Sequence, residues 1–361
     1  MAEVIDPEVE YKSHVSLLSK ASSSMIPFAR NSPTLLWENQ EIFRLKEMSY
    51  YSIDGSNQKI ENKIDFSHDI ELMKLSTKVY GGDTVDLYEQ EYNKFCTEII
   101  QKESQVMSLE VNNESCLAMA RRYSDFGEEP LVMDLAERNA KHVCGSWNSY
   151  YVGSQEEAIE RQSVFLRYAL DPKLNATLSA QLSILTPGSP IKHHIPEYGA
   201  LLVQHVPIIR DRDMRLSRDW WKCGVIAIGA PDLRLKAFRE TDFSKFSDSS
   251  GVSKAKHYFS IRGAAPELHM EELRLSLKRK IRISLVAAVS RGYLDIVLGA
   301  LGCGAYRNPI DEVATCFAQV LGEKEFRNNF RRVGFAVLGD PTFSLFRQYF
   351  MTEWEAQNRD H

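Results

Sequence analysis

Two short stretches of the sequence place residue types that can do chemistry beside the expected start of a helix. The first is "GSQEEAIERQSVF" (153–165), in which Gln155 is followed by Glu156 and Glu157. Glycosidic chemistry needs a carboxyl group that protonates a leaving oxygen, and negative charge that favours an oxocarbenium-like transition state. Ser154 and Glu157 also have the spacing of a capping box, in which the carboxylate reaches back to the start of the helix. Two interpretations of Glu157 therefore stay open, a structural cap and a catalytic acid.

The second stretch is "GALGCGAYRNP" (299–309), where an apolar run ends in five loop residues: Gly302, Cys303, Gly304, Ala305 and Tyr306. We expect a helix to follow, with Asn308 as its N-cap and Pro309 at its first position. Glycine adopts positive φ and leaves room beside the backbone, so that successive N–H groups can point at a diphosphate. A tight turn that merely needs glycine is the other interpretation. The loop lacks the lysine of a P-loop and the third glycine of a dinucleotide-binding fingerprint.

Composition and charge exclude several classes of protein. The 361 residues are 43% hydrophobic and 26% charged, with a formal net charge of -5, which is ordinary globular composition. Broad attraction to nucleic acid or to an anionic membrane is therefore not expected, and a phosphate site must be built locally. The six cysteines are scattered without a CxxC pair, which favours reduced thiols in a cytosol-like compartment over a disulfide framework or a zinc site. No apolar run has transmembrane length, and the acidic start of the chain is unlike a signal peptide.

Apolar runs alternate with helical patterns from residue 114 onward. We expect strands at 130–136, 200–209, 223–231, 295–301 and 333–339, and helices at 114–127, 154–170, 271–292 and after the glycine loop. Strands that are continuously apolar argue for a mostly parallel sheet covered on both faces. The sequence therefore predicts an α/β protein, a three-layer α/β/α sandwich with the glycine loop at the carboxyl end of a strand, where such sheets bind ligands.

The remaining parts of the chain are assigned more simply. A hairpin is expected with its turn at Asp54-Gly55. Residues 1–33 are interpreted as an appended N-terminal segment, 34–350 as the main domain with its accessory region, and 351–361 as a C-terminal tail. We expect His193 and His194 to be surface histidines without a metal, and the basic run 278–282 to be a solvated helix face.

Taken together, these segments resemble the microbial-type poly(ADP-ribose) glycohydrolase family, a branch of the macrodomain fold. "GALGCGAYRNPIDEVATCFAQVL" is similar to the glycine signature of that family and to the helix after it, and "GSQEEAIERQSVF" to its Gln-Glu-Glu helix. "GALLVQHVPIIRDRD", "CGVIAIGAPDL" and "VGFAVLGDP" are similar to three of its strands. The resemblance covers about residues 35 to 345 in order. It implies a macrodomain-like sandwich with a mixed, mostly parallel sheet and an N-terminal extension, with ADP-ribose as ligand and no cofactor.

The resemblance also implies roles for particular residues. The glycine loop (Gly302, Cys303, Gly304, Ala305 and Tyr306) would lie against the diphosphate, with the Tyr306 ring against the distal ribose. Gln155, Glu156 and Glu157 would fall on the family's Gln-Glu-Glu; Glu157 would be the catalytic acid, and Glu156 would help to position the ligand. Asn113 and Glu114 would lie on the adenine side. If Glu157 is not the acid, Asp134 and Glu137 are the next residues to consider.

One departure from the family concerns the loop before Gln155. The family has Pro-Gly-Gly-Gly there, as its first phosphate and ribose loop, whereas this chain has "CGSWNSYYVGSQEE". Only Gly145 remains, and Trp147, Tyr150 and Tyr151 are bulky, which restricts the approach of a ligand to the backbone. We therefore expect processing of long polymers to be altered, while the ADP-ribose fold is kept.

The function expected from these observations is an ADP-ribosyl hydrolase that removes ADP-ribose from a modified protein. A non-catalytic reader of ADP-ribosylated protein or free ADP-ribose is the alternative, and an enzyme of nucleotide-sugar or NAD metabolites on the same fold is a third. The expected partners are ADP-ribose or an ADP-ribosylated protein, with a monomeric chain and with neither nucleic acid nor a membrane. We expect action in the cytoplasm, or in a host cytosol as a secreted bacterial effector.

Overall fold

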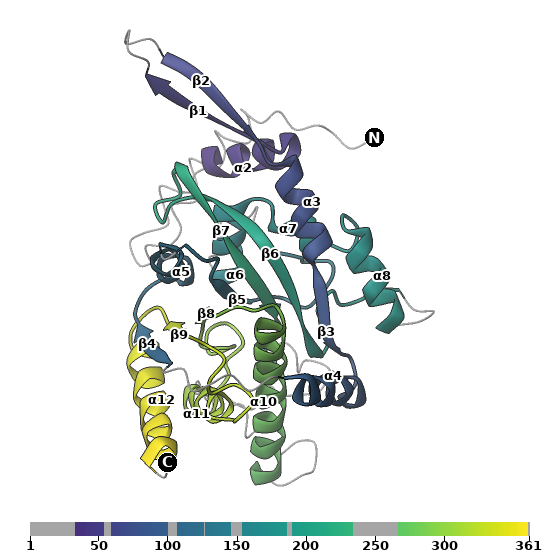
Figure 1. The fold of residues 1–361 in the computed structure, drawn as a ribbon, viewed down its shortest axis with the longest axis vertical. Coiled ribbons are helices and arrows are strands. Elements are labelled where there is room, and N and C mark those ends of the chain that lie inside the picture. Colours follow the sequence, from purple (N-terminus) through teal and green to yellow (C-terminus); the bar gives the residue numbers. More distant parts are fainter. Residues whose placement is uncertain are drawn as a thin grey trace, which may run out of the picture.

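A seven-stranded sheet with helices on both faces forms the body of the molecule (Figure 1). The computed structural model describes residues 33–53, 59–99, 107–125, 127–145, 154–185, 190–233 and 266–359. The appended segment that we assigned to residues 1–33 therefore lies almost wholly outside the described residues. The expected turn at Asp54-Gly55 and the loop residues Trp147, Tyr150 and Tyr151 lie outside them as well.

The sheet has the strand order β3-β6-β7-β5-β8-β9-β4. Its strands are β3 (Lys78–Gly82), β4 (Ser108–Asn112), β5 (Leu131–Leu135), β6 (Tyr198–Arg210), β7 (Leu216–Ile228), β8 (Asp295–Leu298) and β9 (Arg332–Ala336). The pairs β7·β5, β5·β8, β8·β9 and β9·β4 are parallel, whereas β6 is antiparallel to both of its neighbours. The predicted mixed, mostly parallel sheet is confirmed.

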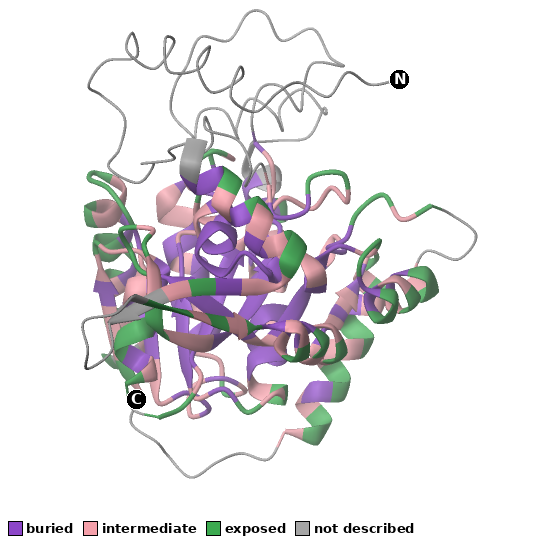
Figure 2. Cartoon of the chain, turned by 90° about the horizontal axis from the view of Figure 1, so that it is seen from above, coloured by how far each residue is buried: buried purple, intermediate pink, exposed green. Residues whose placement is uncertain are grey.

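The helices cover the sheet in two layers. They are α2 (Pro33–Leu45), α3 (Ser67–Ser76), α4 (Val85–Glu98), α5 (Cys116–Ser124), α6 (Gln155–Ser163), α7 (Leu166–Leu170), α8 (Ala176–Leu185), α10 (Pro266–Ser290), α11 (Ile310–Leu321) and α12 (Thr342–Arg359). Side chains of α4, α10, α11 and α12 share one core, and those of α3, α5, α6, α7 and α8 share the other. Figure 2 shows the buried residues gathered between these layers.

Strand β5 shows why an apolar run produces this architecture. Leu131 and Met133 point into the core that contains α10, whereas Val132 points into the core that contains α5 and α6. Successive side chains of a strand alternate between the faces of a sheet, so a strand buried on both faces must be apolar throughout. The same alternation places Asp134, the one charged residue of β5, on the face of α5 and α6.

The N-terminal hairpin is a separate, smaller sheet. Strand β1 (Glu47–Ile53) pairs antiparallel with β2 (Lys59–Asp65), as the sequence predicts. The hairpin projects from the body at the end opposite to α12 (Figure 1).

Two predicted helix boundaries differ from the structure. The helix expected at 154–170 is broken, because Val164 adopts φ 67° and separates α6 from α7. The helix after the glycine loop begins at Ile310 with Pro309 as N-cap, so Asn308 is not a cap. Instead, Asn308 is buried, and its side-chain amide donates to the carbonyl oxygens of Pro231 (2.8 Å) and Gly302 (3.3 Å). Residues 351–359, which we assigned to a tail, continue α12.

Two predictions of exposed charge are wrong. His194 is fully buried, and its burial lowers the pKa of the imidazole to about 3. Lys280, in the basic run of α10, is also fully buried, and its ammonium group pairs with Glu197 Oε1 at 3.2 Å. Both side chains are enclosed by segments distant in sequence, which a local pattern does not reveal. None of the described helices has the length and apolar character that crossing a bilayer requires.

Candidate active site

The segments that carry the predicted site residues meet at one edge of the sheet. Residues 113–114 follow β4, 136–139 follow β5, 299–306 follow β8 and 337–339 follow β9. These four strands are mutually parallel, so their carboxyl ends lie at the same edge, which is where open α/β sheets bind ligands. Along this edge the order is β5, β8, β9, β4.

The start of α6 is fixed on β5 by the side chain of Gln155. Its Nε2 donates to the carbonyl oxygen of Met133 at 2.8 Å, and its Oε1 accepts from the backbone N–H of Leu135 at 3.0 Å. The amide thus pairs with the strand as a neighbouring backbone would, on either side of Asp134. Gln155, predicted as a ligand residue, is in this structure the residue that positions the two glutamates after it.

Glu156 and Glu157 are both buried, each with 4% of its surface exposed. Glu156 Oε2 accepts from the backbone N–H of Glu137 at 3.0 Å. Glu157 Oε2 accepts from the backbone N–H of Ser154 at 3.0 Å and also from its hydroxyl, and the predicted capping box is formed. The cap occupies Oε2, whereas Oε1 faces Gly145.

Gly145 lies directly against these two carboxylates. It has φ +59°, and an added Cβ would lie 2.2 Å from Glu157 Oε1 and 3.1 Å from Glu156 Oε2. Both distances are shorter than ordinary carbon–oxygen contacts, so no side chain fits there without displacing a glutamate. The one glycine that remains of the family's glycine loop thus closes over the point where the two carboxylates converge.

Further acidic side chains lie beneath this pair. Asp134 is fully buried, and among the described residues neither of its oxygens has a hydrogen-bond partner. Burial, with the charge of Glu157 in addition, raises the pKa of Asp134 to about 7. Burial likewise raises the pKa of Glu160 to about 8, although the neighbouring Cys144 thiol lowers it. Burial and then the charge of Asp134 hold the pKa of Glu156 well above its usual range. Asp134, Glu160 and Glu156 therefore share protons at neutral pH.

The two glycines of the loop after β8 differ in what surrounds them. Gly302 has φ +72°, and an added Cβ would lie 2.1 Å from the Asn308 amide nitrogen and 2.7 Å from Ala230 Cβ. Gly304 is exposed, and an added Cβ there would meet nothing within 4 Å. Gly302 therefore serves the turn itself, whereas Gly304 leaves backbone accessible. Burial raises the pKa of the Cys303 thiol, which does not suit a nucleophile.

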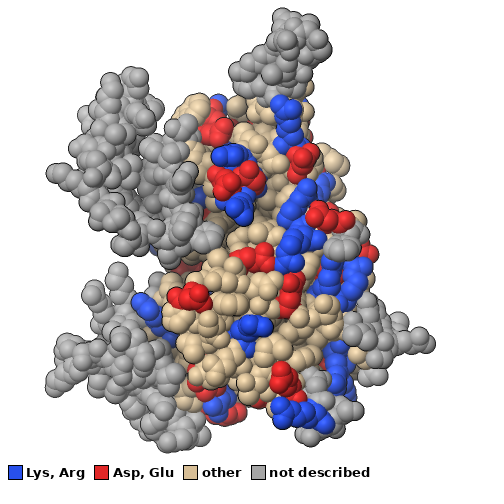
Figure 3. Space-filling model, turned by 90° about the vertical axis from the view of Figure 1, so that its left-hand side faces the viewer, with Lys and Arg blue, Asp and Glu red and all other residues tan. Residues whose placement is uncertain are grey.

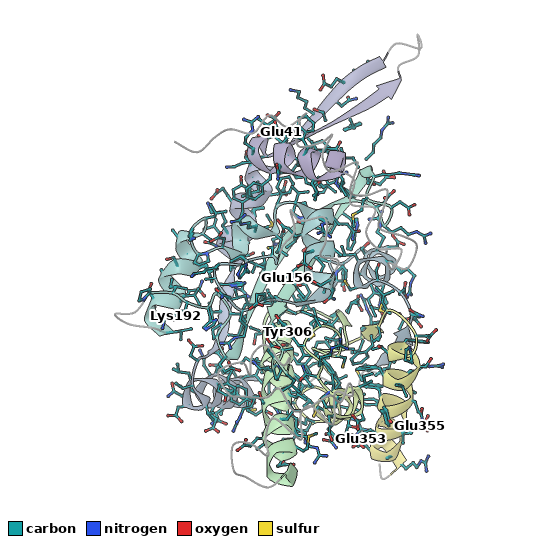
Figure 4. All side chains as sticks on the ribbon, turned by 180° about the vertical axis from the view of Figure 1, so that it is seen from behind. Glu41, Glu156, Lys192, Tyr306, Glu353 and Glu355 are labelled. Atoms are coloured by element: carbon teal, nitrogen blue, oxygen red, sulfur yellow. The ribbon has the colours of Figure 1, made fainter. Side chains whose placement is uncertain are left out.

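Tyr306, at the end of this loop, joins it to β5. Its hydroxyl donates to Glu137 Oε2 at 3.0 Å, and its carbonyl oxygen accepts from the N–H of Leu233 at 3.0 Å. Glu156, from the start of α6, and Tyr306, from the loop after β8, lie near each other in the middle of the molecule (Figure 4). The glycine loop and the two glutamates thus lie on two sides of one site, connected through Glu137.

Asn113 and Glu114 lie at the other end of the same edge. Asn113 Oδ1 accepts from the N–H of Gly339 at 3.0 Å, and the Glu114 carboxylate pairs with Arg122. Strands β8 and β9 separate these residues from α6. They do not contact the glutamates, but they share the carboxyl edge with them.

The sequence patterns missed part of this arrangement. They do not single out Glu160, and they offer Asp134 and Glu137 only as substitutes for Glu157. The charged residue within "LVMDL" was an available signal, because an acidic side chain in a strand buried on both faces needs an explanation. No cluster of side chains suited to a metal ion is present in the described part of the chain.

Comparison with known proteins finds a matching family model and solved structures of similar fold. Residues 42–177 match the family model of the microbial-type PARG catalytic domain. The poly(ADP-ribose) glycohydrolase (PARG) of Thermomonospora curvata is 21% identical, with a TM-score of 0.60 over 88% of this chain and 98% of that one. The PARG of Deinococcus radiodurans, solved in complex with ADP-ribose, is 20% identical, with a TM-score of 0.56 over 78% of this chain and 97% of that one. No curated protein sequence matches.

The architecture shared with these structures confirms the predicted macrodomain-like fold. The match over residues 42–177 includes the residues after β4, the buried Asp134 of β5 and the whole of α6. The glycine loop lies beyond the matched residues, in the part of the chain that shares the fold. Over residues 42–177 the chain is similar to the microbial-type PARG catalytic domain, and most of the chain shares the fold of bacterial PARG structures.

Proposed function

We propose that this chain is an ADP-ribosyl hydrolase that releases ADP-ribose from a modified protein side chain. The observation that carries the proposal is the convergence of Glu156 and Glu157 beside Gly145, at the carboxyl end of β5 and next to a glycine loop. Two buried carboxylates at a ligand-binding edge suit glycosidic chemistry, and the family is one of glycohydrolases.

The order of the strands suggests how ADP-ribose would lie. Asn113 and Glu114 after β4 would take the adenine end, and the backbone from Gly302 to Tyr306 after β8 would take the diphosphate. The distal ribose would then reach the end of β5, where Glu156 and Glu157 are. The family relative from Deinococcus radiodurans, whose structure contains ADP-ribose, supports this choice of ligand.

In this arrangement Glu157 acts as the general acid. Its protonated carboxyl donates to the leaving atom as the bond from that atom to C1 of the distal ribose breaks, and water then adds to the sugar as a proton returns to the carboxylate. The backbone N–H of Ser154 holds Oε2, which fixes the orientation of the carboxyl group.

The acceptor that we propose is a protein rather than a long polymer. The basis is the sequence before Gln155, where bulky residues replace the family's glycines. Acidic and basic side chains are interspersed on the face in Figure 3. We further propose that residues 34–350, together with the end of α12, act as one monomeric unit in a reducing cytosol, either of the cell that makes the protein or of a host that receives it.

The deciding experiment is incubation with a mono-ADP-ribosylated protein and measurement of free ADP-ribose. Release that is lost in Glu157→Gln supports a hydrolase. Binding without release, with the folded protein in excess, would instead make the chain a reader. Turnover of a small ADP-ribose conjugate alone would favour an enzyme of nucleotide metabolites. Calorimetric titration with free ADP-ribose is the prior test, and no heat at millimolar ligand would contradict the whole proposal.

A further inference from the structure

Glu137 contacts both the glycine loop and the start of α6. Its Oε2 accepts from the Tyr306 hydroxyl at 3.0 Å, and its backbone N–H donates to Glu156 Oε2 at 3.0 Å. Its remaining oxygen, Oε1, accepts from the N–H of Asn139 at 3.2 Å. Glu137 therefore connects the glycine loop to the glutamates of α6, although it belongs to neither segment.

The short segment that carries Glu137 is held firmly on both sides. The N–H of Ala136 donates to the carbonyl oxygen of Ile228 at 3.0 Å. The Arg138 side chain donates to the carbonyl oxygen of Ile195 at 3.1 Å and pairs with Glu197. The Arg138 side chain packs directly against Gly229. A Cβ added at Gly229 would lie 2.1 Å from Arg138 Cγ, so only glycine leaves space for the arginine. The Glu137 carboxylate thus projects from a fixed backbone.

The chemistry of a carboxylate restricts which part of a ligand can lie against it. A diphosphate would be repelled, whereas the hydroxyls of a ribose can donate to it, and carboxylates bind ribose hydroxyls in this way in other α/β folds. Each carboxylate oxygen accepts more than one hydrogen bond, so the contacts with Tyr306 and Asn139 leave capacity for a ligand. Glu137 lies at the end of β5, three strands away from the proposed adenine side at β4.

We propose that Glu137 is a specificity-determining residue for the distal ribose, which accepts hydrogen bonds from its hydroxyls and holds the Tyr306 ring beside it. This inference rests on the proposed function, because it takes ADP-ribose as the ligand and its distal ribose as the part nearest α6. It adds a residue outside the Gln-Glu-Glu run to the recognition of the sugar.

The test compares two ligands that differ by the distal ribose. ADP has the adenosine and the diphosphate but lacks this sugar, so calorimetric titration with ADP-ribose and with ADP separates the ribose contact from the rest. In Glu137→Ala, the Kd for ADP-ribose should rise about 10- to 30-fold, as for a lost hydrogen bond to a charged group, while the Kd for ADP stays unchanged. Tyr306→Phe should raise the Kd for ADP-ribose less, by about threefold.

Controls keep the failure modes apart. Glu89→Ala removes an exposed carboxylate from α4 and should change neither affinity. Glu137→Gln keeps an acceptor for Tyr306, so it serves if the alanine variant does not fold, and it should weaken ADP-ribose alone by a smaller factor. If the wild-type chain does not bind ADP-ribose, the proposed function itself is wrong. If the wild type binds ADP-ribose but the Glu137 variants lose affinity for ADP-ribose and ADP equally, the role of Glu137 is overturned and the proposed function stands. The same holds if the variants lose affinity for neither ligand.

Discussion

The start of α6 and the loop into α11 face the same edge of the sheet, but one is buried and the other is open. Glu156 and Glu157 are 4% exposed and are held by hydrogen bonds from Glu137 and Ser154. In the loop, Gly304 and Ala305 are exposed, and an added Cβ at Gly304 would meet no neighbour. The first region is constrained by the protein around it, whereas the second leaves backbone accessible to a ligand.

This difference separates the work of the two regions. Burying a carboxyl group lowers the stability of the folded state, because burial disfavours the charged form. Such groups with shifted pKa values are found mainly at functional sites. An accessible backbone costs little, and its N–H groups bind an anion only once one arrives. We therefore expect changes at α6 to reduce the rate of reaction and changes at the loop to reduce affinity.

The largest effect is expected at Glu157. Glu157→Gln keeps the shape of the side chain and an oxygen that can still cap α6, but it removes the ionisable proton. If Glu157 is the general acid, the rate of ADP-ribose release should fall about 10²–10⁴-fold, with the affinity for ADP-ribose largely kept. Release under single-turnover conditions, together with calorimetry, measures both quantities.

Glu156→Gln is the matched control for this change. It removes a neighbouring carboxyl of the same burial, and its amide oxygen can still accept from the N–H of Glu137. We expect a smaller loss of rate, accompanied by weaker binding. A near wild-type rate in Glu157→Gln would show that the capping box is the whole role of Glu157.

A steric change at Gly145 should have the next largest effect. Gly145→Ala places a Cβ 2.2 Å from Glu157 Oε1 and also imposes φ +59° on a residue with a side chain. We expect a loss of rate of about 100-fold, because misplacing a catalytic group by an ångström is costly. Gly292→Ala is the control, since its φ is +76° but its Cβ would meet nothing within 4 Å. It should lose about 1–2 kcal/mol of stability and no activity. Equal activity in the two variants would refute the assigned contact.

The two regions also differ in how far the sequence alone reveals them. The glycine loop and the capping box depend on residues within a few positions of each other, and both were predicted. The burial of Glu156, Glu157 and Glu160 depends on β5 and Gly145, which lie elsewhere in the chain, so "QEEAIERQS" resembles an exposed helix start. His194 and Lys280 were misjudged for the same reason. Strands β5 to β9 are predicted because they contain continuous apolar runs, whereas the edge strands β3 and β4 are not predicted, and the break at Val164 has no local signal.

The buried carboxyls predict how stability depends on pH. The folded pKa values of Asp134 (about 7) and Glu160 (about 8) lie above the unfolded ones, so their contribution to stability is present at low pH and is lost as the pH rises through these values. His194, with a pKa lowered to about 3, destabilises the folded state only below about pH 6.5, where the imidazole of the unfolded chain is protonated. The pKa of Lys280 is lowered to about 8, so this residue changes the pH dependence of stability mainly above pH 8.

The window from pH 6.5 to 8 therefore isolates the carboxyls. The free energy of unfolding should fall by at least about 2 kcal/mol across it, because the raised pKa of Glu156 adds to the contributions of Asp134 and Glu160, and urea titration at several pH values measures the fall. Asp134→Asn keeps the shape of the side chain without its titration and should reduce this fall by about 1 kcal/mol. An unchanged slope would mean that Asp134 does not hold its proton in this range.

The smallest effect is expected in the open loop, where two glycines only two residues apart should respond differently. Gly304→Ala adds a methyl group that meets no neighbour, so the free energy of unfolding should change by less than about 0.5 kcal/mol. If a diphosphate approaches the backbone there, the same methyl group obstructs it, and the Kd for ADP-ribose should rise about 10-fold. Gly302→Ala is the contrast, because its Cβ would overlap the Asn308 amide and the residue has φ +72°. It should destabilise the protein by about 1–3 kcal/mol. If Gly304→Ala binds ADP-ribose as the wild type does, the loop is only a turn, and the diphosphate must lie against another part of the carboxyl edge.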